Sequence, residues 1–324
     1  MRQLLKSGII SLVLIFQFIR PAGACDLCSV YSASAAQGFT ARGFSLGLSE
    51  QFTHFGTLKQ DGHDVTNTLG QSLDSSITQL FVSYQFLHRL GAQLTLPYIV
   101  RSYTRSDGLG GTESDSFSGI GDISLTAKLL AYEKNSEDFT LNVSFMGGVK
   151  FPTGSASRLN EELNEEEEED ESSIVASGIH GHDLVLGSGS YDALFGGSLY
   201  TRWKRFFVTT DLQYSVRTRG AVDYKFANDL HWSVSPGCFI LMTHANTLTL
   251  QARFSGEYKG LDNLDGASAD DTGITSVYFG PDLSYTWRSK LAANFGIDVP
   301  VVLSNTALQS VPDYRLRSSI NWHF

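Results

Sequence analysis

The segment from Tyr314 to Phe324 alternates between apolar and polar side chains at every second position. One set of alternate residues is mostly apolar and includes Trp322 and Phe324, whereas the other set includes Arg315 and Arg317. A strand of this kind can lie between lipid and a wet interior, as the strands of transmembrane β-barrels do. An ordinary half-buried strand is the alternative interpretation.

The same two-residue period recurs along the chain and defines twelve candidate strands. Lengths of about 10–14 residues fit a tilted strand that crosses a bilayer. The candidate at 228–241 has the least certain facing, because aromatic side chains occur on both of its faces. The candidates span residues 41–54, 76–87, 92–103, 119–131, 139–150, 190–201, 206–217, 228–241, 247–259, 274–287, 291–302 and 313–324.

The connections between these strands alternate between short and long, and the longest runs from about 151 to 189. Short periplasmic turns and long extracellular loops are typical of outer-membrane barrels. A soluble β-sandwich would also alternate, but it would not predict this succession of connection lengths. Closure into a barrel leaves no strand edge unpaired in hydrocarbon. We therefore predict an all-β fold: a closed antiparallel barrel of about 12 strands over residues 41–324, in the cell outer membrane and in contact with its lipid.

The beginning of the chain resembles a secretory signal peptide. A positively charged start precedes the mostly apolar stretch Ile9–Ile19, and small residues stand directly before Cys25. The apolar stretch is too short for a comfortable membrane-spanning helix. We expect residues 1–24 to be the signal peptide and 25–40 to form a periplasmic segment. Lipid attachment at Cys25 is an open alternative.

Cys25 and Cys28 form a closely spaced pair in this periplasmic segment. In an oxidising compartment such a pair is a candidate disulfide, redox site or metal site. Haem attachment would need a histidine where Ser29 stands. A zinc site would need further ligands from elsewhere in the chain.

The acidity of the chain is local. The formal net charge is −10, and nine acidic residues lie in the run Glu161–Glu171 of the loop 151–189. The same loop contains His180 and His182. A solvated acidic loop is one interpretation, and weak collection of cations is the other. A nucleic-acid partner is not expected for an acidic exported barrel.

If the apolar set faces lipid, charged residues of the other set line the interior. They could pair across the lumen and brace the barrel, or they could line a pore. The near balance of acids and bases argues against a ring of one sign and strong ion selectivity. A barrel of about twelve strands has a lumen between the filled interior of eight strands and the open channel of sixteen. The candidate pore-lining residues are Asp122, Lys128, Lys150, Arg217, Arg253, Glu257, Asp282, Arg315 and Arg317.

Catalysis has little support in the sequence. Outer-membrane phospholipases of this strand number need a serine and a histidine near the outer rim on the lipid face. No such pair falls on the outward positions there, although His54 and His231 are possible bases. We expect no enzyme activity and no cofactor.

Three segments resemble recurring elements of the outer-membrane family called "putative MetA-pathway of phenol degradation". They are Gly119–Lys128, Gly148–Gly154 and Gly187–Asp192, and they occur in the order typical of that family. The resemblance covers roughly residues 76–324 and implies a channel-like outer-membrane barrel. It implies passive passage of a small solute, hydrophobic or aromatic in character.

The alternative function is a non-transporting barrel, either a surface-interaction protein or the sleeve of a periplasmic redox or metal partner.

Whichever function applies, the aromatic end of the last strand resembles the closing strand of bacterial outer-membrane proteins. That resemblance implies that Trp322 and Phe324 are an assembly signal for the barrel-assembly machinery.

Overall fold

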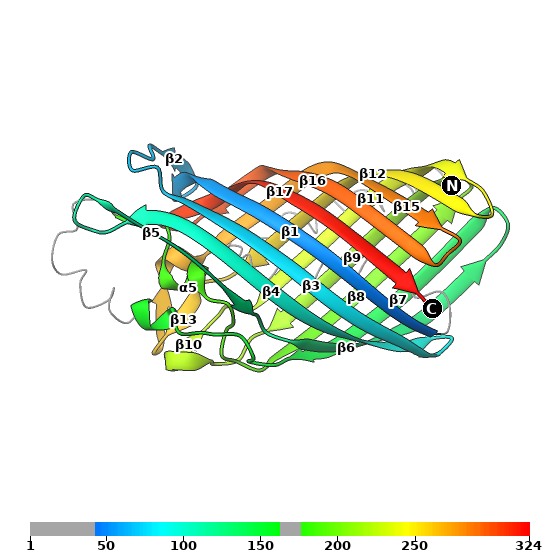
Figure 1. Ribbon diagram of the computed structural model, residues 1–324, viewed down its shortest axis with the longest axis horizontal. Helices are drawn as coiled ribbons and strands as arrows, with labels where there is room; N and C mark the ends of the chain where they lie inside the picture. The colour runs from blue at the N-terminus through cyan, green and yellow to red at the C-terminus, as the bar shows by residue number, and fades with distance from the viewer. Residues whose placement is uncertain (1–42, 163–175) are drawn as a thin grey trace, which may run out of the picture.

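The computed structural model describes residues 43–162 and 176–324, which form a closed antiparallel β-barrel (Figure 1). Strands that follow one another in the chain pair with one another, and the last strand, β17, pairs with the first, β1, to close the wall. Twelve strands make up the wall in this part of the chain. The predicted fold class is therefore confirmed. The signal peptide, Cys25, Cys28 and most of the acidic run lie outside the described residues.

The observed wall strands match the predicted ones closely, and several are longer. The wall is built from β1 (Gly43–Gln60), β3 (Ser72–Leu87), β4 (Leu90–Ser106), β6 (Ser124–Asn135), β7 (Phe139–Lys150), β8 (Asp192–Trp203), β9 (Phe206–Val216), β11 (Asp229–Met242), β12 (Asn246–Lys259), β15 (Ile274–Trp287), β16 (Leu291–Asn305) and β17 (Leu308–His323).

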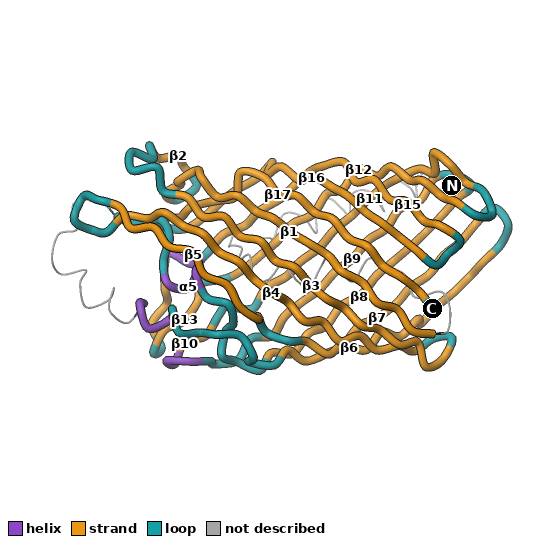
Figure 2. The backbone as a smooth tube through the Cα atoms, in the orientation of Figure 1, coloured by secondary structure: helices purple, strands orange, loops and turns teal. Residues whose placement is uncertain are grey.

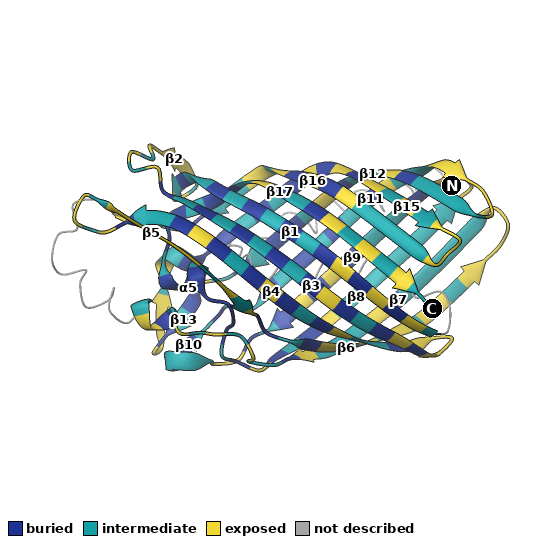
Figure 3. Ribbon diagram, viewed as in Figure 1, coloured by how far each residue is buried: buried dark blue, intermediate teal, exposed yellow. Residues whose placement is uncertain are grey.

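Alternation of side chains sets which face of each strand points inward. In β3, Leu80 and Tyr84 are exposed on the outer face, whereas Gln79 and Ser83 between them are buried in the lumen. The same alternation of buried and exposed positions runs along neighbouring strands (Figure 3). The large apolar residues exposed on the outside are those that a hydrocarbon environment would cover.

The two ends of the barrel differ as predicted. One end, called here the turn end, carries five short hairpin connections, such as Lys204–Arg205 and Arg288–Lys290. In the second of these, Arg288 and Ser289 both have positive φ, as tight hairpin turns require. The opposite end, the loop end, carries the longer connections, and the helical turns and most of the loop structure lie there (Figure 2).

One connection at the loop end contradicts the sequence prediction. Residues 303–312 were expected to form a long loop, but β16 and β17 extend through this region and only Thr306 and Ala307 connect them. Asn305 stabilises this tight connection, because its side-chain amide donates hydrogen bonds to the carbonyls of Lys59 and Ala307.

The predicted strand 119–131 is also corrected, because it is interrupted. Its first part ends β5 (Thr112–Ile120), which pairs with β4, and its second part belongs to β6. Between them Gly121 approaches Ile99 so closely that a Cβ atom at this position would collide with its side chain, and it would also crowd Pro97 and the carbonyl of Leu186. The break turns Asp122 inward, where it joins a buried network described below.

Several short helices and strands lie in the connections of the loop end. The helix α5 (Gly181–Leu184) and the strand β2 (His63–Val65) belong to two of its connections, and a three-stranded sheet joins two others. No helix in the described part of the chain is long and apolar enough to span a membrane. The remaining elements are β10 (Tyr224–Lys225), β13 (Asp262–Leu264), β14 (Ala267–Ala269), and the 3₁₀ turns η2 (Ala221–Asp223) and η3 (Asp270–Thr272).

Candidate functional site in the barrel lumen

The lumen contains a cavity of about 420 Å³ in its half nearest the turn end. Polar residues such as Asn142, Gln251 and Ser284 line part of its wall, and Lys128 and Asp211 lie at its inner limit. Such a volume falls in the range of small-molecule sites, about 300–1,000 Å³. The cavity is therefore large enough for a small organic molecule.

One side of this cavity is aromatic. Tyr200 of β8, Phe207 of β9 and Phe239 of β11 all line it. The ring centroids of Tyr200 and Phe207 are 5.9 Å apart, and those of Phe207 and Phe239 are 5.1 Å apart. The pairing of β11 with β12 is irregular between Phe239 and Leu241. Aromatic residues lie on both faces of this strand. The sequence signal at 228–241 thus marked a real departure from simple alternation.

A belt of charged side chains crosses the middle of the lumen. Arg317 of β17 binds two carboxylates, with Nε 2.6 Å from Asp298 Oδ2 and Nη1 3.3 Å from Asp282 Oδ2. Opposite them, the Asp211 carboxylate interacts electrostatically with Lys128 and with Arg253. This central belt separates the cavity from the loop-end half of the lumen.

A second network lies nearer the loop end, and its groups form a chain of ion pairs. Lys150 Nζ lies 2.7 Å from Asp122 Oδ2 and 2.6 Å from Asp192 Oδ2. Arg217 continues the chain, because it lies 2.9 Å from Asp192 Oδ2 and 2.7 Å from Asp229 Oδ2. All five side chains are almost completely buried. Charges removed from water in this way are tolerated only when they are paired and hydrogen-bonded.

The long connection between β7 and β8 folds into the lumen at the loop end. Its residues 176–191, called here the plug, fill this end with apolar side chains. Leu186 packs with Ile77 and Ile99 of the barrel wall, while Ile179 and Leu184 belong to a second apolar cluster. This second cluster also contains Phe55, Leu73 and Tyr103. The described part of the loop therefore differs from the solvated loop expected from its composition.

Hydrogen bonds fasten both ends of the plug. At its root, Ser188 donates from its backbone N–H to Asp122 Oδ2, at 2.9 Å. At its tip, the Gly178 N–H donates to Gln71 Oε1 at 3.0 Å, and the Gly178 carbonyl accepts from the Ser310 N–H at 2.6 Å. The tip thus contacts the part of the wall where β17 pairs with β1. These strands are far in the sequence from β7 and β8, which the plug connects.

The loops beside the plug contain buried polar side chains that are hydrogen-bonded to one another. Tyr224 donates its hydroxyl to Asp262 Oδ2 at 2.7 Å, and Lys259 Nζ lies 2.6 Å from the same oxygen. Burial of Tyr224 and the nearby Asp262 carboxylate raise the pKa of its hydroxyl well above the ordinary value. Tyr224 therefore stays protonated and remains a hydrogen-bond donor.

The structure places the predicted lumen residues in three groups, while their role in permeation stays a prediction. Asp122, Lys150 and Arg217 belong to the chain of ion pairs; Lys128, Arg253, Asp282 and Arg317 belong to the central belt; Glu257 and Arg315 pair with each other. The plug and the aromatic side of the cavity were not predicted. Ile77 and Phe81 on the polar face of β3 were the available signal for apolar packing inside the lumen.

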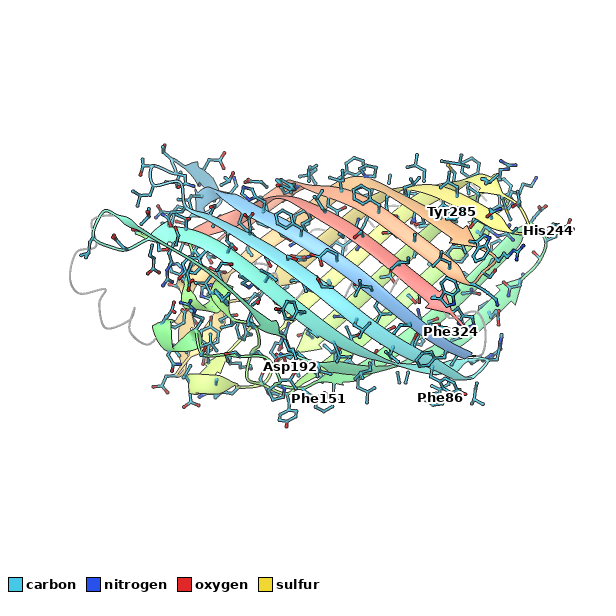
Figure 4. The ribbon with its side chains drawn as sticks, viewed as in Figure 1. Phe86, Phe151, Asp192, His244, Tyr285 and Phe324 are labelled. Atoms are coloured by element: carbon cyan, nitrogen blue, oxygen red, sulfur yellow. The ribbon has the colours of Figure 1, made fainter. Side chains whose placement is uncertain are left out.

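The outer face carries aromatic residues near both ends of the barrel (Figure 4). Phe86, Tyr285 and Phe324 lie toward the turn end, and Phe151 lies toward the loop end. Trp322, also exposed, lies beside Phe324, with ring centroids 6.4 Å apart. Aromatic girdles at two heights are typical of barrels in the outer membrane. The predicted role of Trp322 and Phe324 in assembly stays a prediction.

Comparison with known proteins agrees with the barrel fold. The family model described as "Putative MetA-pathway of phenol degradation" matches residues 57–164. An outer-membrane channel from Pseudomonas putida F1 has a similar structure, with a TM-score of 0.59 at 15% sequence identity, covering 90% of this chain and 98% of that one. No curated protein matches the chain.

Two autotransporter barrels are also similar, more distantly. The β-domain of the Bordetella autotransporter BrkA gives a TM-score of 0.48 at 9% identity, covering 88% of this chain and 100% of that one. The translocator domain of NalP from Neisseria meningitidis gives 0.42 at 11% identity, with coverages of 92% and 93%.

The fold and its exterior define a β-barrel of the outer-membrane type. Within that class, the chain resembles the family described as "Putative MetA-pathway of phenol degradation", as its sequence elements indicated. The turn end therefore faces the periplasm and the loop end the cell exterior.

Proposed function

We propose that the barrel allows passive passage of a small solute, hydrophobic or aromatic in character, across the outer membrane. The observation that carries this proposal is the cavity of about 420 Å³ with Tyr200, Phe207 and Phe239 on one side. Aromatic side chains favour aromatic ligands, with a gain of about 0.5–1.5 kcal/mol per ring pair beyond the burial of area. The resemblance to a family described by phenol degradation supports the same class of solute.

The apolar contacts of the plug support the proposal in a second way. In the described arrangement the plug covers Ile77, Ile99 and Leu194 inside the lumen. If the plug moves aside, these side chains become an apolar surface along the path from the exterior to the cavity. A hydrophobic solute could then replace Leu186 against this surface. Passage thus requires displacement of the plug, and the solute itself compensates part of the lost contact.

Planar-bilayer recordings on purified, refolded protein test passage itself. We expect discrete conductance steps, which become rarer when the plug is held in place. Silence under all voltages and salts would overturn the proposal and favour the non-transporting barrel, whether a surface-interaction protein or a sleeve for a periplasmic partner.

The class of solute needs a separate test. Proteoliposomes would be used to compare entry of benzoate with entry of acetate, since both carry one negative charge and differ in the aromatic ring. Phe207→Ala removes a ring that faces the cavity, and Phe206→Ala removes an exposed ring on the outer face of the same strand. We expect the benzoate preference to fall about twofold to tenfold in the first variant. An equal effect of both variants would contradict an aromatic pathway through the lumen.

A further inference from the structure

Two loops at the extracellular end bring three potential metal ligands together. His180 and His182 lie on the plug beside and within α5, and Asp271 lies in η3, between β12 and β15. One ligand atom from each residue can be chosen so that all three lie within 4.8 Å of one another. His180 Nδ1 is 2.7 Å from Asp271 Oδ2, and the two imidazole centroids are 5.6 Å apart. Within the described part of the chain, this group brings two imidazoles and a carboxylate close enough together to bind one metal ion.

The surroundings of His182 orient its ring. Its Nδ1 lies 3.1 Å from Glu162 Oε1, and the same oxygen accepts a hydrogen bond from the His182 backbone N–H at 2.5 Å. Only 4% of His182 and 6% of Glu162 are exposed. A carboxylate that fixes one ring nitrogen leaves the other nitrogen directed toward a metal, as in many histidine metal sites. Nε2 of His182 is therefore the ligand atom that this arrangement offers.

We propose that His180, His182 and Asp271 bind a divalent transition-metal ion such as Zn²⁺. Imidazole and carboxylate together suit Zn²⁺, Cu²⁺ and Ni²⁺, whereas Ca²⁺ takes oxygen ligands. The ligands must move closer, because zinc bonds are about 2.0–2.2 Å long. Asp183 offers a fourth ligand, since its Oδ1 is 3.5 Å from His182 Nε2.

The site would join two separate loops. His180 and His182 belong to the plug, whereas Asp271 belongs to the connection that leads into β15. A bound ion therefore fastens the plug to the connection between β12 and β15, in addition to its hydrogen bonds to Gln71 and Ser310. The competing explanation is a cluster of ion pairs between protonated histidines and carboxylates, with no metal.

Zinc titration of the full refolded chain in detergent, in competition with a chromophoric chelator, separates these explanations. The titration is done on a Cys25→Ser, Cys28→Ser background, because that cysteine pair could also bind zinc. We expect one Zn²⁺ per chain, with affinity at least about tenfold weaker in His180→Ala and in His182→Ala. Glu162→Gln should weaken binding about tenfold to a hundredfold, as expected for a group that orients a ligand.

A matched control uses another histidine of the extracellular end. His63 is exposed on β2, and His63→Ala should leave zinc affinity unchanged. Equal affinity in the His63 and His182 variants, or no stoichiometric binding in the parent protein, would overturn the proposal. Heat-modifiable migration on gels shows that each variant is folded.

A measurement on the parent protein makes the test independent of the variants. X-ray absorption at the zinc edge should show imidazole scattering, and oxygen ligands alone would overturn the proposal. Hydrogen exchange across residues 176–191 should slow at least severalfold when Zn²⁺ is added. Zinc that binds without slowing this exchange lies elsewhere, which also contradicts the proposed site.

Discussion

Arg315 and Glu257 form a bidentate ion pair inside the lumen. Arg315 Nη1 donates to Glu257 Oε1 at 2.6 Å, and Nη2 donates to Oε2 at 3.2 Å. Arg315 lies on β17 and Glu257 on β12, so the wall strands β15 and β16 stand between them. The guanidinium also lies over the ring of Tyr278, 4.0 Å from its centroid. This contact connects strands that share no backbone hydrogen bonds.

Breaking this pair should destabilise the barrel strongly. Arg315→Gln leaves the buried Glu257 carboxylate without its guanidinium, and removing one partner of a buried pair costs about 3–5 kcal/mol. Urea unfolding in lipid vesicles measures the free energy of unfolding. Arg288→Gln, in a periplasmic turn, is the control and should have little effect. A loss below about 1 kcal/mol in Arg315→Gln would mean that the pair does not brace the barrel.

The two faces of one strand should respond differently to the same substitution. Leu283 of β15 is 44% exposed on the outer face, whereas its neighbour Ser284 lines the lumen cavity. Arginine at position 283 should cost about 2–4 kcal/mol if it lies near the middle of the bilayer. Ser284→Arg should cost much less, because water and polar groups surround that position. Vesicle unfolding titrations compare the two, and equal costs would show that the assigned facing is wrong.

Ion preference should depend on Lys128. Its side chain lines the cavity beside Asp211, and a charge in a narrow passage acts strongly on a passing ion. Lys128→Glu should shift the reversal potential toward cation preference, more at low salt than at high salt. Lys134→Glu is the control, because Lys134 is exposed near the periplasmic end of the same strand. If both variants behave alike, the charges near the cavity do not control passage.

Loosening the plug should increase opening. Leu186→Ala removes side-chain atoms that pack against Ile77 and Ile99, and a change of this kind costs about 2–5 kcal/mol of contact free energy. Because these contacts hold the plug rather than the wall, we expect more frequent conductance steps with little change in barrel unfolding. Leu261→Ala, at a partly exposed position of another extracellular loop, is the control. Unchanged opening together with unchanged hydrogen exchange across 176–191 would contradict a moving plug.

Most of the wall could be predicted from the sequence, because the facing of a strand depends on a local two-residue period. The inward side of β3 and the short turn at Arg288–Lys290 follow from such local patterns. The break before β6 could not be predicted, since Gly121 is crowded there by side chains of β4 and by the carbonyl of Leu186, and these come from distant parts of the chain.

Which charged residues pair inside the lumen could not be predicted from the sequence, for a similar reason. Strand order identifies which residues face inward, but the stagger between strands decides which of them share a height. Arg315 meets Glu257, and Arg317 meets Asp298, although the two arginines are only two residues apart. The plug was missed because its composition near the acidic run suggested solvation, whereas Ile179, Leu184 and Leu186 are buried.

The way the plug is fastened sets the shape of any opening. Its root is held by Ser188 and Asp122, beside the strands from which it comes, and its tip rests against the opposite wall near Gln71 and Ser310. Release of the tip therefore frees space first along that opposite wall. The aperture would be a crescent bordered by β17, β1 and β3, the strands that lie beside the tip, rather than a round hole in the middle of the lumen.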